Sequence, residues 1–257
     1  METSPDPWID ALRRSHDRLQ ALVEPLGQDQ LEQRSYASEW SIAQVLSHLG
    51  SGAEIFGMFL EAGLAGQDPP GREAFGPIWN TWNAKDPQAQ AADGLRTDEA
   101  AVERFESLDP GQKADLRLHI FGMDLDVAGL ARMRVSEHSV HTWDVAVALD
   151  PSATVAPDAV GLLIDTVGQL AARAAKPDGK ERRILVSTSD PERHFILETG
   201  DSVTLTESDR EDGLPELRLP AEAFVRLVYG RLGPHHTPPV QADGVDLEEL
   251  RQLFPGF

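Results

Sequence analysis

The stretch that decides the fold spans residues 130–147 and reads LARMRVSEHSVHTWDVAV. At 100° per residue its apolar side chains fall on one face, so we expect a helix over about 123–148, ended by Asp150-Pro151. Glu137, His141 and Asp144 share this apolar face. Burying a carboxylate without a partner costs several kcal/mol. The two acids therefore need a partner, and a metal ion is one.

A second helix, expected over about 41–63, carries another inward-facing histidine. Ser41 and Gln44 form a capping box, and Trp40 precedes the cap. His48 lies on the apolar stripe of this helix, which should enter a bundle core.

Together the two helices offer three ligands for one metal ion. Glu137 and His141 stand one helical turn apart, and His48 supplies the third ligand from the other helix. Three protein ligands leave one coordination position open, as in catalytic zinc sites. Asp144 would accept a hydrogen bond from a ligating imidazole. The alternative is a metal-free core in which the acids satisfy the histidines.

The remaining histidines lack such spacing. His138 is rotated about 100° from the apolar stripe, so we expect it to flank the site or contact a ligand. His16, His119 and His194 are isolated, and we interpret them as structural or exposed.

The rest of the chain divides into a helical part and a mixed part. Further helices are expected over 8–24, 97–108 and 157–175, with a long irregular connection over 66–96. After Lys176-Pro-Asp-Gly179, short β-favouring runs predict strands over 183–188, 194–199, 203–207 and 216–219. Two helices are expected over 220–232 and 246–253. The predicted fold class is α plus α/β, with a helical bundle over 1–175 and a small α/β domain over 176–257.

Composition narrows the classes of partner. The 257-residue chain has a net charge of -20, which repels phosphate backbones and anionic lipid headgroups, so we expect neither nucleic-acid nor membrane partners. An anionic substrate would need a local Arg or Lys.

The chain has no cysteine, so thiol chemistry would need an external thiol. No signal peptide or membrane span is evident in the sequence, so we expect a cytoplasmic protein, either a monomer or a homodimer.

Two motifs resemble a known family. Residues 40–49 (WSIAQVLSHL) and 134–145 (RVSEHSVHTWDV) are similar to the mycothiol-dependent maleylpyruvate isomerases, within the DinB-like superfamily of metal-binding four-helix bundles. The resemblance places the family's metal ligands on His48, Glu137 and His141. It also implies a small C-terminal α/β domain, whose Gly-Arg signature matches Gly230-Arg231.

The resemblance implies a divalent metal, with zinc as the first choice, and mycothiol as cofactor. Arg231 and Asp144 are the expected catalytic residues. Arg226, Lys85 and His138 are the expected cofactor contacts; in the family, Arg commonly takes the place of Lys85. For Arg226, pairing with an acidic neighbour is an equal alternative.

The implied reaction acts on a small, carboxylate-bearing electrophile. It is either cis-trans isomerisation or transfer of the thiol to the electrophile. Two alternatives remain open: a non-catalytic module that binds a metal or ligand, and a metal-dependent hydrolase that uses bound water.

Overall fold

The computed structural model describes residues 4–37 and 39–256, and it divides the chain into two compact units. The N-terminal unit ends at Asp150 and the C-terminal unit begins at Pro151. This division lies before the expected boundary between residues 175 and 176, because α8 (Pro157–Leu163) and α9 (Val167–Ala174) pack against the C-terminal elements. The expected α plus α/β fold is confirmed.

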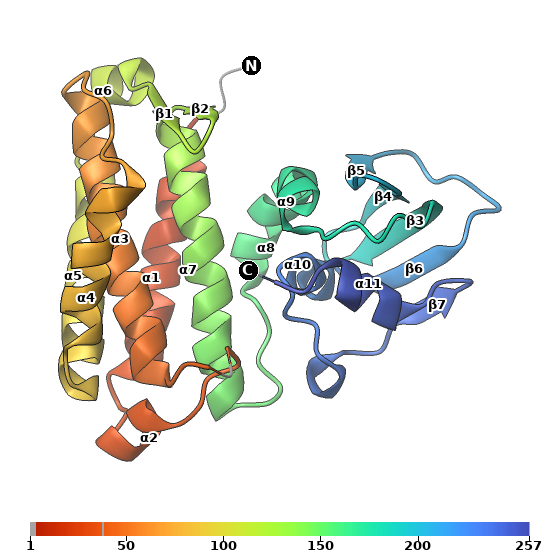
Figure 1. Ribbon diagram of the computed structural model, residues 1–257, viewed down its shortest axis with the longest axis horizontal. Helices are drawn as coiled ribbons and strands as arrows, with labels where there is room; N and C mark the ends of the chain where they lie inside the picture. Colours follow the sequence, from red (N-terminus) through yellow and green to blue (C-terminus); the bar gives the residue numbers. More distant parts are fainter. Residues whose placement is uncertain (1–3, 38, 257) are drawn as a thin grey trace. The chain divides into compact units, whose positions relative to one another are not determined.

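The N-terminal unit is a bundle of four long helices. Figure 1 shows them side by side, and α1 contacts α5 and α7, as does α3, so the four close a ring. They are α1 (Asp6–Val23), α3 (Ile42–Leu64), α5 (Pro87–Glu106) and α7 (Val127–Leu149). Shorter elements connect them: α2 (Gln28–Glu32), η1 (Arg72–Ala74), α4 (Phe75–Asn83), α6 (Pro110–Asp115), β1 (Leu118–Ile120) and β2 (Met123–Leu125).

Helix α3 begins where the sequence predicts. The Ser41 hydroxyl accepts a hydrogen bond from the Gln44 amide at 3.2 Å, and the Gln44 side chain accepts one from the Ser41 amide at 2.8 Å. This capping box fixes the first turn of α3 and so the direction in which His48 leaves the helix.

Helix α7 begins later than the sequence predicts. Asp126 caps it by accepting a hydrogen bond from the Gly129 amide at 2.7 Å. The residues before Asp126 form the β1–β2 hairpin, whose turn holds Phe121 and Gly122 at positive φ. The expected start at residue 123 is therefore wrong, because a local turn and cap stop the helix.

The connection over 66–96 is more ordered than expected. It contains η1 and α4, and α5 already begins at Pro87, where Asp86 caps the helix. A Cβ on Gly94 would lie 2.7 Å from the Leu46 carbonyl oxygen, so the glycine lets α5 approach α3 closely. Because α5 packs on α3 through small residues here, the sequence of this stretch shows no apolar periodicity that would predict a helix.

The C-terminal unit is a five-stranded sheet with helices packed on it. The strand order is β5-β4-β3-β6-β7, with β3 and β6 parallel and the other pairs antiparallel. The strands are β3 (Arg182–Ser189), β4 (Arg193–Thr199), β5 (Thr204–Glu207), β6 (Glu216–Pro220) and β7 (Gln241–Asp243). Helix α9 contacts β5, and α10 (Ala221–Val228) contacts β3 and β6. The other elements are η2 (Ile164–Thr166), η3 (Pro234–His236) and α11 (Leu247–Leu253).

Two expected helices of this unit are shorter than predicted. The stretch 157–175 is broken by η2 into α8 and α9. Helix α10 ends before Gly230, which has φ of 70° and lies so close to the chain end that a Cβ would be 2.3 Å from the Gly256 amide nitrogen. Only glycine fits this turn without strain.

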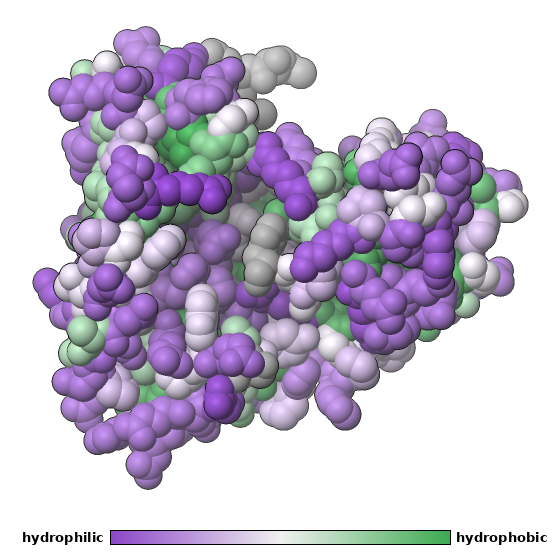
Figure 2. Space-filling model, viewed as in Figure 1, coloured by the Kyte–Doolittle hydropathy of each residue, from purple (hydrophilic) through white to green (hydrophobic). Residues whose placement is uncertain are grey.

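The surface agrees with the acidic composition. Hydrophilic residues dominate the face shown in Figure 2, while apolar residues gather over the β1–β2 hairpin. Phe121 in that hairpin is 48% exposed. Among the described residues no helix is long and apolar enough to cross a membrane.

Candidate metal centre

Helices α3 and α7 bring together the three residues expected to bind a metal. The His48 Nε2 lies 3.3 Å from the Glu137 Oε2, and the His141 Nε2 lies 3.6 Å from the same oxygen. One ligand atom from each residue lies within 4.8 Å of the other two. We call His48, Glu137 and His141 the outer cluster.

The spacing of the outer cluster fits a metal ion. Two ligand atoms that each lie ~2.0 to 2.1 Å from a tetrahedral ion are about 3.3 to 3.4 Å apart. Charge-assisted hydrogen bonds are shorter, at roughly 2.7 to 2.9 Å. The distances of 3.3 and 3.6 Å in the outer cluster therefore match ligands around an ion better than a closed hydrogen-bond network.

Asp144 fixes the orientation of one candidate ligand. Its Oδ2 accepts a hydrogen bond from the His141 Nδ1 at 2.8 Å, and the carboxylate is fully buried. Since the Nδ1 carries the proton in this contact, the Nε2 is left to face Glu137. This is the position that the sequence predicts for Asp144.

The outer cluster is open on one side. The side chains of His48 and Glu137 are 34% and 42% exposed, whereas His141 is 10% exposed. The Trp40 ring packs beside both imidazoles, with centroid distances of 5.0 Å to His48 and 6.0 Å to His141. A small ligand can thus approach the cluster past the two exposed side chains.

The protonation states of His48 and Glu137 suit metal binding. Burial lowers the pKa of His48 more than its hydrogen bond to Glu137 raises it, so its ring is neutral near pH 7. Burial also opposes the charge of Glu137, but hydrogen bonds from His141 and His48 outweigh it and hold the pKa of the carboxyl well below its usual range. A neutral imidazole beside an ionised carboxylate is the form in which these side chains bind a divalent ion. Burial opposes the charge of His141, but its hydrogen bonds with Asp144 and Glu137 outweigh burial and raise its pKa, so an ion must displace its proton.

The family model of the mycothiol maleylpyruvate isomerase N-terminal domain matches residues 12–146, more than half of the chain. The chain belongs to this family. The match includes all three residues of the outer cluster.

Two solved structures share the fold of this family member over both units. The mycothiol-dependent maleylpyruvate isomerase is 12% identical with a TM-score of 0.69, and the match covers 94% of this chain and 93% of that chain. A histidine-to-alanine mutant of that isomerase matches with the same TM-score and coverage at 11% identity. No curated protein sequence matches the chain.

The bundle of this family member holds a second group of histidines and a carboxylate, which the sequence analysis did not predict. The Asp98 Oδ2 lies 2.7 Å from the His16 Nδ1 and 2.7 Å from the His138 Nε2. The Asp98 Oδ1 accepts a hydrogen bond from the Arg134 Nη2 at 2.6 Å. We call His16, Asp98, Arg134 and His138 the inner cluster.

The inner cluster has the geometry of a hydrogen-bond network. Its contacts to Asp98 are 2.6 to 2.7 Å long, too short for two ligands of one ion. Burial opposes the charge of Asp98, but His138 and Arg134 outweigh it and hold the pKa of the carboxyl well below its usual range. A guanidinium already occupies the place that a cation would take.

Two expected site residues of the bundle are engaged elsewhere. His138 is fully buried in the inner cluster, where its Nδ1 accepts a hydrogen bond from the Ser15 hydroxyl at 2.8 Å. The Lys85 ammonium lies 2.7 Å from the Asp93 carboxylate and 3.7 Å from the centroid of the Trp82 ring. These contacts join His138 to α1 and Lys85 to α5.

Two expected arginines lie in the C-terminal unit. Arg226 is 2% exposed, and its guanidinium donates to both carboxylate oxygens of Glu222 at 2.7 and 2.8 Å and to the His236 carbonyl at 2.8 Å. The Arg231 Nη1 donates to the Tyr229 carbonyl at 2.9 Å. The pairing of Arg226 with an acidic neighbour is the alternative that the sequence left open.

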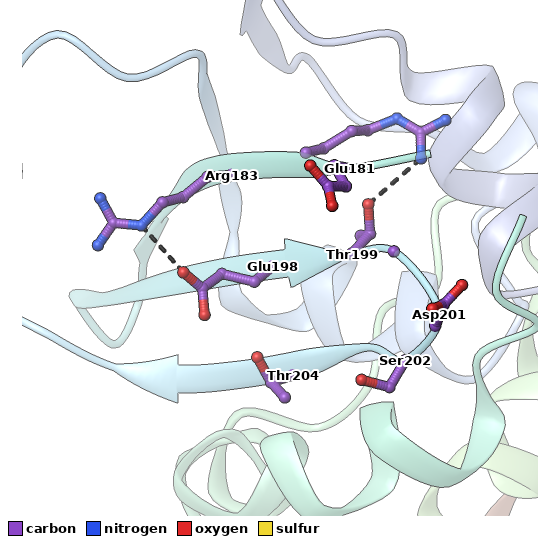
Figure 3. Close-up of a pocket in the computed structure, with 9 residues that line it drawn as sticks. Glu181, Arg183, Glu198, Thr199, Asp201, Ser202 and Thr204 are labelled. Atoms are coloured by element: carbon purple, nitrogen blue, oxygen red, sulfur yellow. Dashed lines mark hydrogen bonds and ion pairs between the residues drawn. The ribbon is translucent and has the colours of Figure 1, made fainter. Parts of the chain in front are cut away.

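A separate depression in the C-terminal unit lies along β3, β4 and β5. It encloses about 560 Å³ (Figure 3). The Arg183 Nε donates to Glu198 at 3.1 Å, and the Arg182 Nη1 donates to the Thr199 hydroxyl at 3.3 Å. The residues that line it include no histidine, so it lacks the chemistry of the outer cluster.

Proposed function

We propose that the chain is a metal-dependent enzyme that uses a low-molecular-weight thiol, mycothiol, to isomerise a small unsaturated dicarboxylic acid. The observation that carries the proposal is the outer cluster, with its 3.3 and 3.6 Å spacing on a bundle of this family. Transfer of the thiol to the electrophile is the second candidate reaction, because it needs the same residues.

In this proposal His48, Glu137 and His141 hold a divalent ion, with zinc as the first choice. Two imidazoles and a carboxylate suit zinc and leave a coordination position open. When bound, the ion stabilises the thiolate of an external thiol and lowers the pKa of the thiol. The chain itself has no cysteine to serve instead.

The surrounding residues keep the outer cluster in one geometry. Asp144 holds the proton on the His141 Nδ1, so the Nε2 stays available as a ligand. The Trp40 ring packs against the imidazole of His48. A contact between Arg231 and a carboxylate remains a prediction from the sequence.

The test is a turnover assay with the zinc-loaded full chain, mycothiol and maleylpyruvate. We expect cis-to-trans conversion that needs mycothiol and does not consume it; consumption of the thiol would instead identify transfer. His48→Ala should abolish turnover. His119→Ala is the matched control, because His119 is exposed in the hairpin and bonded only to Asp124 among the described residues.

Two results would contradict the proposal. One is a His48→Ala variant as active as the parent. The other is turnover that proceeds at the same rate without any thiol, which would favour chemistry by bound water.

A further inference from the structure

Arg134 has guanidinium hydrogens that the protein does not use. Its Nη2 donates to the Leu49 carbonyl at 2.8 Å and to the Asp98 Oδ1 at 2.6 Å. Within residues 4–37 and 39–256, neither the Nη1 nor the Nε of Arg134 takes part in a hydrogen bond, and the Nε is buried. Buried donors are nearly always paired in proteins, so an unpaired guanidinium edge points to a missing acceptor.

The Nη1 of Arg134 lies against Gly52 of α3. A Cβ on Gly52 would lie 2.9 Å from the Arg134 Nη1 and 4.0 Å from its Cζ. The missing side chain at Gly52 therefore lets the guanidinium approach the backbone of α3 one turn from His48.

This edge of the guanidinium adjoins the outer cluster. Gly52 follows His48 by one turn of α3, and Arg134 precedes Glu137 by about one turn of α7. One turn advances ~5.4 Å, so a ligand beside the open side of the outer cluster can also reach the Nη1.

The charge of Arg134 is available to a ligand. Asp98 is its ion-pair partner, but the same carboxylate also binds His16 and His138. On a chain of net charge -20, an anionic ligand needs a local cation to approach Glu137. Arg134 places such a cation one turn from that carboxylate.

We propose that Arg134 binds a carboxylate of the substrate through its Nη1, beside Gly52. The proposal deepens the proposed function and rests on it for the position of the reacting centre. It names the ligand class as a small organic anion, and it gives the buried Asp98 the role of holding the guanidinium toward the outer cluster.

The test is calorimetric titration of zinc-loaded protein with maleate, a small cis-dicarboxylate without a thiol. Arg134→Gln should weaken maleate binding by roughly tenfold or more, since it removes a charge-assisted hydrogen bond. Arg104→Gln is the control for net charge, because Arg104 is exposed and paired with Glu61 at the far end of α3. It should bind maleate as the parent does.

A charge-compensated double variant separates this role from a purely structural one. In Arg134→Met with Asp98→Asn, the core loses one charge of each sign, so the fold no longer needs the guanidinium. We expect the double variant to bind maleate as weakly as Arg134→Gln. Binding restored to the parent affinity would mean that Arg134 only neutralises Asp98, and would overturn the proposal.

Gly52→Ala tests the same guanidinium edge if the double variant does not fold. The added methyl group would lie 2.9 Å from the Nη1, so it must displace or cover the guanidinium edge. We expect weaker maleate binding with unchanged zinc content. Parent-like maleate affinity in this variant, or no maleate binding by the parent, would contradict the proposal. Zinc content and thiol-dependent turnover of the parent, measured separately, test the proposed function whichever result is found.

Discussion

The bundle contains two clusters that each place two histidines around a carboxylate, and they differ in spacing and exposure. In the outer cluster the Nε2 atoms of His48 and His141 lie 3.3 and 3.6 Å from the Glu137 Oε2. The side chains of His48 and Glu137 are 34% and 42% exposed. In the inner cluster the distances are 2.7 Å and every side chain is at most 2% exposed. Judged only by their two histidines and one carboxylate, both clusters could bind a metal ion. The distances between the side chains and their exposure to solvent distinguish them.

The difference also lies in what neutralises each carboxylate. Asp98 has the Arg134 guanidinium at 2.6 Å, so its charge is balanced by the protein. Within the described residues, the ion-pair contacts of Glu137 are with imidazoles, and one of these, His48, has a lowered pKa because burial disfavours its charge. The carboxylate of the inner cluster is already balanced by a guanidinium, whereas the outer cluster has room for a cation.

The largest expected effect follows from removing the inner carboxylate. Asp98→Ala leaves Arg134 without its ion-pair partner in the core, and we expect a loss of about 3 to 5 kcal/mol in the free energy of unfolding. Glu137→Ala in metal-free protein should cost less than about 1 kcal/mol, because the side chain is 42% exposed. Urea denaturation of both variants measures the contrast. Equal losses of unfolding free energy in the two variants would contradict the proposed difference between the clusters.

Zinc should stabilise the parent through the outer cluster. At a free zinc concentration of 100 times Kd, binding to the folded state alone adds about 2.7 kcal/mol to the free energy of unfolding. His48→Gln should lose this increment and His16→Gln should keep it. Thermal unfolding with and without zinc gives the comparison. An increment that survives in His48→Gln would place the ion elsewhere.

The sequence was sufficient to predict the outer cluster because two of its three members lie one turn apart on a single helix. Glu137 and His141 interrupt an apolar stripe that also contains Asp144, and a capped partner helix supplies His48. A helical wheel and one capping box contain all of this information.

The inner cluster could not be found in the same way because its members come from three helices. His16 is on α1, Asp98 on α5 and Arg134 on α7, so no single wheel shows them together. A signal was nevertheless present: Asp98 shares a helical face with the buried Val102 and Phe105.

The pH dependence of stability should come from the inner cluster. Burial disfavours a charged His16, but its hydrogen bond to Asp98, together with the charges of Asp98 and Glu99, outweighs burial and raises the pKa of His16, although Arg13 opposes this. A raised folded-state pKa stabilises the protein fully below the unfolded value of ~6.5, and this contribution is lost as the pH rises through the folded-state pKa.

The corresponding measurement is the free energy of unfolding of the metal-free parent and of His16→Gln from acidic to alkaline pH. The advantage of the parent should be largest below pH ~6.5 and should shrink as the pH rises. A difference that is constant across this range would show that His16 does not change its charge.

The smallest expected effect concerns the edge of the inner cluster. Ser15→Ala removes the 2.8 Å hydrogen bond to the His138 Nδ1, and we expect a loss of about 1 kcal/mol because the Thr142 hydroxyl remains 3.3 Å away as a second partner. Urea denaturation measures this, and zinc content should not change. A loss of zinc in Ser15→Ala would mean that the inner cluster affects zinc binding at the outer cluster, which the geometry does not predict.

The central claim is that the outer cluster, not the inner one, holds the metal. Elemental analysis of zinc-equilibrated parent, His141→Gln and His138→Gln tests it, since these two histidines lie three residues apart on α7. We expect about one ion per chain in the parent and in His138→Gln, and none in His141→Gln. A parent without zinc, or zinc lost from His138→Gln and kept by His141→Gln, would contradict the account.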